Sequence, residues 1–140
     1  WSAGGMMTSW LITHDTRWKA AFDGAAVTSL LGVQTMSDVD SYGQALMKGN
    51  PWADEALMKA TLEESPLTYA DRVKTPTLIV TDAGDQRVPT PLSYEFYHAV
   101  RATGTPAELL VYPVNGHFPA DPLHAEDVNR RWIDWFAKHF

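Results

Sequence analysis

The stretch TLIVTDAGD, residues 77–85, decides the fold class of this chain. Its first five residues form a continuous apolar and β-branched run, with Pro76 before it and an aspartate- and glycine-containing turn after it. A continuous run, in place of an alternating one, indicates a strand that is buried on both faces. Strands of this kind are typical of parallel sheets, so we predict that residues 77–81 form a parallel strand.

Two further segments are predicted to join the same sheet. Residues 108–112 (ELLVY) are predicted to form the next buried strand. Residues 18–26 (WKAAFDGAA) combine apolar with small residues, as a central strand with crowded neighbours would, and Asp23 and Gly24 indicate a turn at its end.

Helices are predicted between and after these strands. Thr90-Pro91 opens a helix that Gly104 ends, and residues 125–140 form a final helix. The final helix has an apolar stripe at helical spacing, made of Val128, Trp132, Trp135 and Phe136. The alternation of strands and helices predicts an α/β fold with crossover helices. In such a sheet, ligands bind beyond the carboxyl ends of the strands.

Residues 27–70 carry the weakest pattern. Residues 41–47 and 53–62 are predicted as helices, the second opened by Asn50-Pro51, and residues 66–73 as one short helical turn. A helical excursion between strands either covers an active site or forms plain surface helices, and the pattern favours neither.

Composition excludes several classes of protein. The chain has 140 residues, one domain or less, and its formal charge of −6 argues against a surface for nucleic acid or an anionic membrane. No apolar run approaches the roughly 20 residues that span a bilayer. The absence of cysteine removes any thiol nucleophile and is consistent with a cytoplasmic protein.

The first residues, WSAGG (1–5), run into an apolar helical pattern over residues 6–14 that we expect to be buried through Met7, Trp10 and Leu11. A serine between small residues at the start of a helix has the form of the G-x-S-x-G nucleophile elbow. The first glycine of that motif would precede Trp1, so we expect residues 1–140 to be the C-terminal portion of a longer hydrolase domain.

Three residues supply the groups of a nucleophilic triad. A serine hydroxyl needs a base, and the base needs an anion to hold its tautomer. Ser2, Asp85 and His117 occur in the Ser…Asp…His order of α/β-hydrolases, each at an expected strand end. The Ala3 amide, at a helix N-terminus, is a natural oxyanion donor.

Each assignment has an alternative at this point. Ser2 could be a turn residue or a helix cap, Asp82 competes with Asp85 for the acid, and His124 competes with His117 for the base. His117, His124 and Asp121 match no standard zinc spacing, so we expect no metal and no cofactor.

The segments WSAGGMMTSW, KTPTLIVTDAGDQRVP, NGHF and the terminal WIDWF resemble the prolyl oligopeptidase family of serine peptidases, with the acylaminoacyl-peptidase branch most similar. The resemblance covers nearly the whole chain. It implies Ser2 as nucleophile, His117 as general base and Asp85 as the orienting acid. It favours Asp85 over Asp82 because the family's acid precedes the Arg-Val-Pro sequence, here residues 87–89.

The chain departs from the family pattern in three respects. Ala3 stands where the family commonly has tyrosine, and Thr81-Asp82 replaces a frequent His-Gly. Family members also carry a β-propeller and the first half of the hydrolase sheet before this region. We therefore expect the missing N-terminal portion, with the second oxyanion donor, as another chain or a further segment.

The function that follows from the resemblance is hydrolysis of short peptides, of the aminopeptidase or acylaminoacyl-peptidase type, through an acyl-enzyme on Ser2. A carboxylesterase with the same triad is the first alternative. A catalytically incomplete hydrolase-like fragment that serves as an assembly partner is the second.

Overall fold

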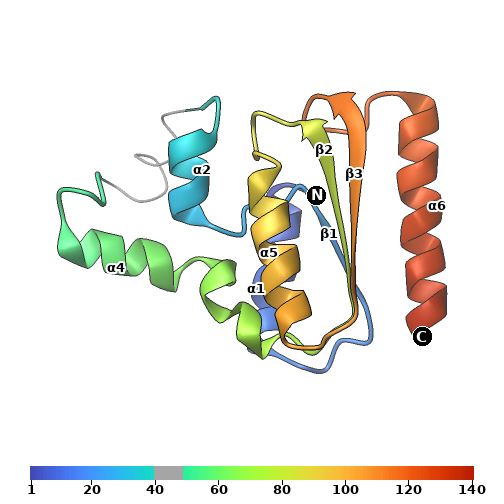
Figure 1. The fold of residues 1–140 in the computed structure, drawn as a ribbon, viewed down its shortest axis with the longest axis horizontal. Helices are drawn as coiled ribbons and strands as arrows, with labels where there is room; N and C mark the ends of the chain where they lie inside the picture. The colour runs from blue at the N-terminus through green and yellow to red at the C-terminus, as the bar shows by residue number, and fades with distance from the viewer. Residues whose placement is uncertain (40–48) are drawn as a thin grey trace.

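A computed structural model describes residues 1–39 and 49–140 (Figure 1). Its sheet has three parallel strands in the order β1-β2-β3. The strands are β1 (Ala21–Gly24), β2 (Thr77–Gly84) and β3 (Ala107–Asn115). The helices are α1 (Ala3–His14), α2 (Leu30–Met36), α4 (Glu55–Glu63), the 3₁₀ helix η1 (Pro66–Arg72), α5 (Pro91–Ala102) and α6 (Pro122–His139). The predicted α/β class with a parallel sheet is confirmed.

Strand β2 lies between its two neighbours and is buried from Thr77 to Asp82. On one face, Leu78 and Val80 pack with Val128 and Trp135 of α6. On the other face, Ile79 belongs to a cluster that includes residues of α1 and α5. Figure 1 shows the same division, with α6 on one side of the sheet and α1 and α5 on the other. Burial on both faces explains the continuous apolar run.

Strand β3 was predicted to be buried, and that prediction is wrong. Its residues are half-buried or exposed and none is fully buried, because β3 pairs with β2 alone among the described strands. The strand also continues to Asn115, past the predicted end at residue 112. Gly84 of β2 pairs with Asn115 after an irregularity in the register that follows Asp82.

The buried face of α1 also differs from the prediction. Met7 and Leu11 are 63% and 44% exposed, and Trp10 is half-buried. The buried residues are Gly5, Ser9, Ile12 and Thr13. A Cβ on Gly5 would lie 2.6 Å from the carbonyl oxygen of Gly24, so α1 approaches β1 too closely for a large side chain on that face. Bulky residues are therefore turned away from the sheet.

Helix boundaries between β1 and β2 were only partly predicted. Helix α2 was missed, since it has seven residues and includes a glycine, a valine and a threonine, which are weak helix formers. The helix predicted over 53–62 is present as α4, but its N-cap is Asp54, so Asn50-Pro51 lies before the helix and does not open it. The short helix at Pro66 is present as η1. The predicted helix over 41–47 lies outside the described residues.

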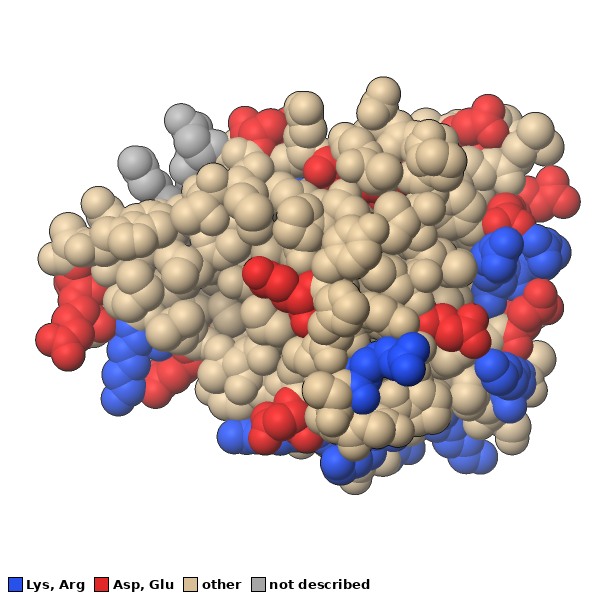
Figure 2. All heavy atoms as spheres, in the orientation of Figure 1, with Lys and Arg blue, Asp and Glu red and all other residues tan. Residues whose placement is uncertain are grey.

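Helix α6 has Val128 and Trp135 buried, as predicted, but Trp132 is 39% exposed. Across the described ranges 1–39 and 49–140, we find no helix with the length and apolar character needed to cross a bilayer. On the face in Figure 2, basic and acidic side chains are interspersed.

Two neighbouring glycines test the close packing of α1. Gly5→Ala places a methyl group against the Gly24 carbonyl and should lower the free energy of unfolding by about 1–3 kcal/mol. Gly4→Ala is the matched control, because nothing lies within 4 Å of its added Cβ. It should be neutral or stabilising by up to about 1 kcal/mol. Urea unfolding of the two variants measures the difference, and equal stabilities would contradict this account.

Candidate active site

Ser2 lies in a strained turn directly before α1. Its backbone has φ 57° and ψ −120°, a conformation that residues other than glycine rarely adopt. The Ser2 N–H donates to the carbonyl of Gly24, the last residue of β1, at 2.8 Å. Ala3 begins α1, so its N–H has no acceptor within the helix. A serine in such a turn, ahead of a helix N-terminus, has the geometry of a nucleophile elbow.

Trp1 connects this turn to the loop that carries His117. The indole N–H of Trp1 donates to the main-chain carbonyl of His117. The Trp1 ring also lies over Gly24, where an added Cβ would be 2.3 Å from the ring. The residue before Ser2 therefore contacts both the end of β1 and the His117 loop.

His117 and Asp85 form a hydrogen-bonded pair. The His117 Nδ1–H donates to Asp85 Oδ2 at 2.7 Å, and the two side chains are 12% and 0% exposed. The other Asp85 oxygen accepts the main-chain N–H groups of Arg87 and Val88, both at 2.9 Å. Three donors thus hold the carboxylate, and the carboxylate fixes the orientation of the imidazole.

The remaining ring nitrogen of His117 is available for chemistry. Nε2 is buried and has no hydrogen-bond partner within the described part of the chain. The hydrogen bonds of those residues do not include one between Nε2 and Ser2 Oγ. The structure thus brings His117 and Asp85 together and ties the residue before Ser2 to the same loop. The nucleophile–base contact, and the role of Ala3 as oxyanion donor, stay predictions.

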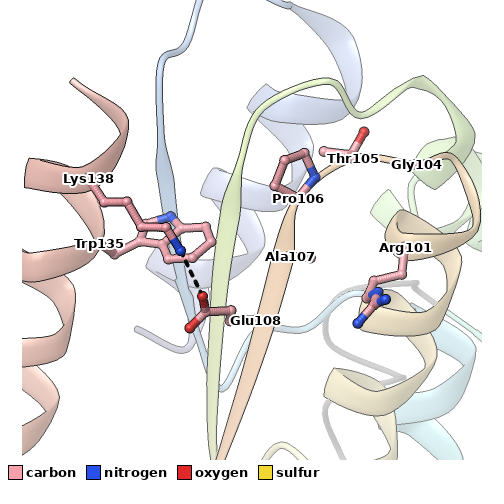
Figure 3. Close-up of a pocket in the computed structure, with 8 residues that line it drawn as sticks. All are labelled: Arg101, Gly104, Thr105, Pro106, Ala107, Glu108, Trp135 and Lys138. Atoms are coloured by element: carbon pink, nitrogen blue, oxygen red, sulfur yellow. Dashed lines mark hydrogen bonds and ion pairs between the residues drawn. The ribbon is translucent and has the colours of Figure 1, made fainter.

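A pocket of about 430 Å³ lies against His117. It is lined by Asp38, Gly84, Gln86, Arg87, Asn115, Gly116 and His117. Arg87 and Asp38 form an ion pair at 2.8 Å within this lining. A second pocket, of about 250 Å³, includes Thr105, Pro106 and Ala107, before and at the amino end of β3 (Figure 3). Only the first pocket lies at the edge of the sheet where a ligand is expected.

The alternative acid and base form a pair of their own. Asp82 Oδ1 lies 3.2 Å from His124 Nε2, and both side chains are nearly or fully buried. Burial raises the pKa of Asp82, with Asp85 adding to that rise, while His124 and His117 oppose it. The two candidate acids and two candidate bases are therefore sorted into two separate pairs, which sequence order alone does not reveal.

Asp23, predicted from the sequence as part of a turn, is a buried carboxyl. It lies within β1, and the Ser9 hydroxyl donates to its Oδ2 at 2.6 Å. Its other oxygen has no partner in the described residues. Burial raises the pKa of Asp23 to about 7, against the opposing effect of the Ser9 hydrogen bond. The sequence feature that could have indicated a buried carboxyl is the position of Asp23 within a strand predicted to be central.

The described residues contain no group of three or more histidine, cysteine, aspartate or glutamate side chains that could hold a metal ion. Asp121 caps α6 by accepting the N–H groups of Leu123 and His124.

The parallel sheet, its flanking helices, the elbow-like turn at Ser2 and the Asp85–His117 pair at the carboxyl ends of the strands together match the C-terminal part of an α/β-hydrolase fold. A family model described as the prolyl oligopeptidase family matches residues 1–140, and the chain belongs to that family. The predicted resemblance is confirmed. The chain is 26% identical over 144 residues to the mouse (Mus musculus) acylamino-acid-releasing enzyme, covering 99% of this chain and 20% of that protein. It is 29% identical to dipeptidyl-peptidase 5 of Porphyromonas endodontalis, covering 98% and 21%.

Solved structures agree with these relatives. A Pyrococcus horikoshii acylaminoacyl peptidase is 25% identical, with a TM-score of 0.88 over 99% of this chain and 23% of that one. An acylaminoacyl peptidase in complex with Z-Gly-Gly-Phe-chloromethyl ketone is 26% identical, with a TM-score of 0.86 over 97% and 22%. The chain spans about a fifth of the length of these relatives.

The strain at Ser2 predicts a gain in stability when it is released. Ser2→Gly should raise the free energy of unfolding by about 1 kcal/mol, because glycine adopts a positive φ without a steric penalty. Ser2→Ala removes the same hydroxyl but keeps the Cβ, so it should be close to wild type. Chemical denaturation of both variants checks this, and an equal effect of alanine and glycine would argue against strain.

The buried Asp23 predicts a pH-dependent penalty. Its folded-state pKa of about 7 lies above the ordinary value of 3.8, so the folded state retains a proton that the unfolded state loses. This residue's contribution to stability therefore falls as pH rises from about 4 to about 7, by up to about 4 kcal/mol.

Asp23→Asn should accordingly stabilise the protein, relative to wild type, by about 3 kcal/mol more at pH 8 than at pH 4.5. Thermal unfolding at the two pH values measures the difference. The exposed Asp134→Asn is the control and should show no such dependence. A constant offset for Asp23→Asn at both values would contradict the assignment.

Proposed function

We propose that this chain carries the triad of a serine peptidase that hydrolyses short peptides. Ser2 Oγ attacks the scissile carbonyl while His117 Nε2 takes the hydroxyl proton, and Asp85 stabilises the resulting imidazolium. The imidazolium then gives that proton to the leaving amine, which leaves an acyl ester on Ser2. A water molecule, deprotonated by His117, hydrolyses the ester. The observation that carries this proposal is the Asp85–His117 pair. Its His117 Nε2 has no hydrogen-bond partner among the residues that the structure describes, and the main chain of His117 accepts a hydrogen bond from Trp1.

The oxyanion of the tetrahedral intermediate needs preorganised donors. The Ala3 N–H is one candidate, since it stands at the N-terminus of α1 beside Ser2. A second donor is expected from a part of the sheet before β1.

Residues 1–140 are proposed to be the C-terminal portion of the hydrolase domain, completed by an N-terminal portion and a β-propeller as a further segment or another chain. Support comes from the length of the relatives and from strand β1, which pairs with β2 alone among the described strands. Beside β1, apolar residues line a pocket of about 230 Å³, among them Leu11, Trp18, Phe22 and Trp132. Covering such an edge would protect it from aggregation.

A cytoplasmic location also stays a prediction, from the absence of cysteine.

The proposed substrate class follows the relatives' names. Two are called acylamino-acid-releasing enzyme and dipeptidyl-peptidase, so release of an N-terminal acylated residue or of a dipeptide is the expected reaction. Amide bonds are harder to cleave than esters, so turnover of an amide separates a peptidase from a carboxylesterase with the same triad.

The test is fluorophosphonate labelling of the complete polypeptide that contains these residues. Wild type should be labelled at Ser2, Ser2→Ala should take no label, and His117→Ala should lose at least about 100-fold in labelling rate. Arg130→Gln, on the exposed side of α6, is the control and should label like wild type.

Peptide p-nitroanilides and p-nitrophenyl esters are then compared as substrates. Turnover of both supports the peptidase, and turnover of esters alone identifies the esterase. A folded wild type that takes no label at Ser2 would leave the hydrolase-like assembly partner as the better interpretation.

A further inference from the structure

Asp82 continues the row of β2 side chains that faces α6. Leu78 and Val80 are the earlier members of this row, and both belong to the apolar cluster with Val128 and Trp135. Two residues further along the same strand, the side chain of Asp82 has no exposed surface. Burying a carboxyl at this position costs free energy unless a neighbouring group interacts with it.

The partner of Asp82 is His124, in the first turn of α6. Oδ1 and Nε2 are 3.2 Å apart, and His124 is 7% exposed. The His124 ring lies on Tyr112, with centroids 4.3 Å apart, and Tyr112 is the register partner of Asp82 on β3. Neither Asp82 oxygen nor His124 Nε2 has a hydrogen-bond partner in the described residues, so the contact between them is an ion pair formed by proximity. Strand, ring and helix therefore enclose a second histidine–carboxylate pair.

This pair joins the two segments that carry Asp85 and His117. The loop that carries Asp85, here called the acid loop, comprises residues 85–90 between β2 and α5. The Asp82 carbonyl accepts the Asp85 N–H at 3.1 Å and the Thr90 hydroxyl at 2.7 Å, so it contacts both ends of this loop. His124 follows the His117 loop and lies within the helix that this loop leads into. The contact between Asp82 and His124 therefore connects the acid loop to the loop that carries His117, residues 116–121.

We propose that Asp82 and His124 are positioning residues of the triad. Their buried pair fixes the Asp85 loop relative to the His117 loop. The Asp82 carboxylate is also a second negative charge, after Asp85, that contributes to the electrostatic field at the His117 ring. The inference rests on the proposed function, because it assigns the pair to the alignment of that triad. Neither residue touches the reacting atoms.

The charged groups around the pair support a role in the field. Asp85 and His117 both interact electrostatically with Asp82, as their effects on its pKa indicate. Beyond His124, the Tyr112 hydroxyl donates to Asp127 at 2.7 Å, and Arg131 binds the same carboxylate. An anionic Asp82 favours the imidazolium of His117, which is the form that develops when Ser2 attacks.

The test uses the complete polypeptide, after fluorophosphonate labelling has established that wild type reacts at Ser2. The variants are Asp82→Asn, His124→Gln and the double variant, and kcat/KM is followed against pH. We expect each single variant to lose about 10-fold in kcat/KM. We also expect the acid limb of Asp82→Asn to move to lower pH, by on the order of one unit.

The double variant should lose little more than either single variant, since both changes break one contact. Glu108→Gln, in an exposed ion pair with Lys138 near the amino end of β3 (Figure 3), is the matched carboxylate control and should keep the wild-type profile. Losses that multiply in the double variant, or an unchanged acid limb in Asp82→Asn, would overturn the proposal. A lower Tm with a wild-type pH profile would also do so.

Ring NMR of the wild-type histidines covers the case in which the variants do not fold. If the pair contributes to the field at His117, the titrations of His117 and His124 are coupled, and each ring shows two steps. Independent single-step titrations would overturn the proposal. This measurement does not depend on turnover, so it also distinguishes failure of the pair from failure of the proposed peptidase function.

Discussion

The hydrogen bonds that Arg87 and Val88 donate to Asp85 are the contacts on which the candidate site depends. They hold one oxygen of a fully buried carboxylate, which leaves the other to accept the His117 ring at 2.7 Å. The acid loop can reach the base because β3 gains a residue relative to β2 between the pairs Asp82–Tyr112 and Gly84–Asn115. Gly84 permits this close approach, since a Cβ there would lie 2.1 Å from Asn115 Oδ1.

Buried ionisable groups concentrate at this same edge of the sheet. Asp85 is satisfied by three donors, whereas Asp82 and Asp23 are less well satisfied and have raised pKa values because they are desolvated. A fold selected for stability alone would place apolar residues at such positions. Strain at Ser2 adds to this local instability. Stored strain and buried charge at one edge are typical of a functional site in a stable scaffold.

Membership in the prolyl oligopeptidase family and the position of β1, which has one neighbour among the described strands, both support the proposal that further strands complete the sheet. The chain spans about a fifth of its relatives, and its apolar residues near Trp18 and Phe22 lie beside a strand with one described neighbour. We therefore propose that two portions of the polypeptide contribute different parts of the active site. Residues 1–140 supply the nucleophile, acid and base, while the preceding portion supplies the neighbouring strands and a second oxyanion donor.

The sequence by itself determined the α/β class, the family and the identity of the candidate residues, because continuous runs such as 77–81 and short motifs such as WSAGG are local signals. Only the tertiary structure decided which side chains meet. The buried face of α1 was mispredicted because Gly5 contacts the end of β1, and the half-buried state of β3 follows from its place in the strand order. Asp82 was separated from Asp85, and His124 from His117, by strand register and helix position, which spacing along a chain does not encode.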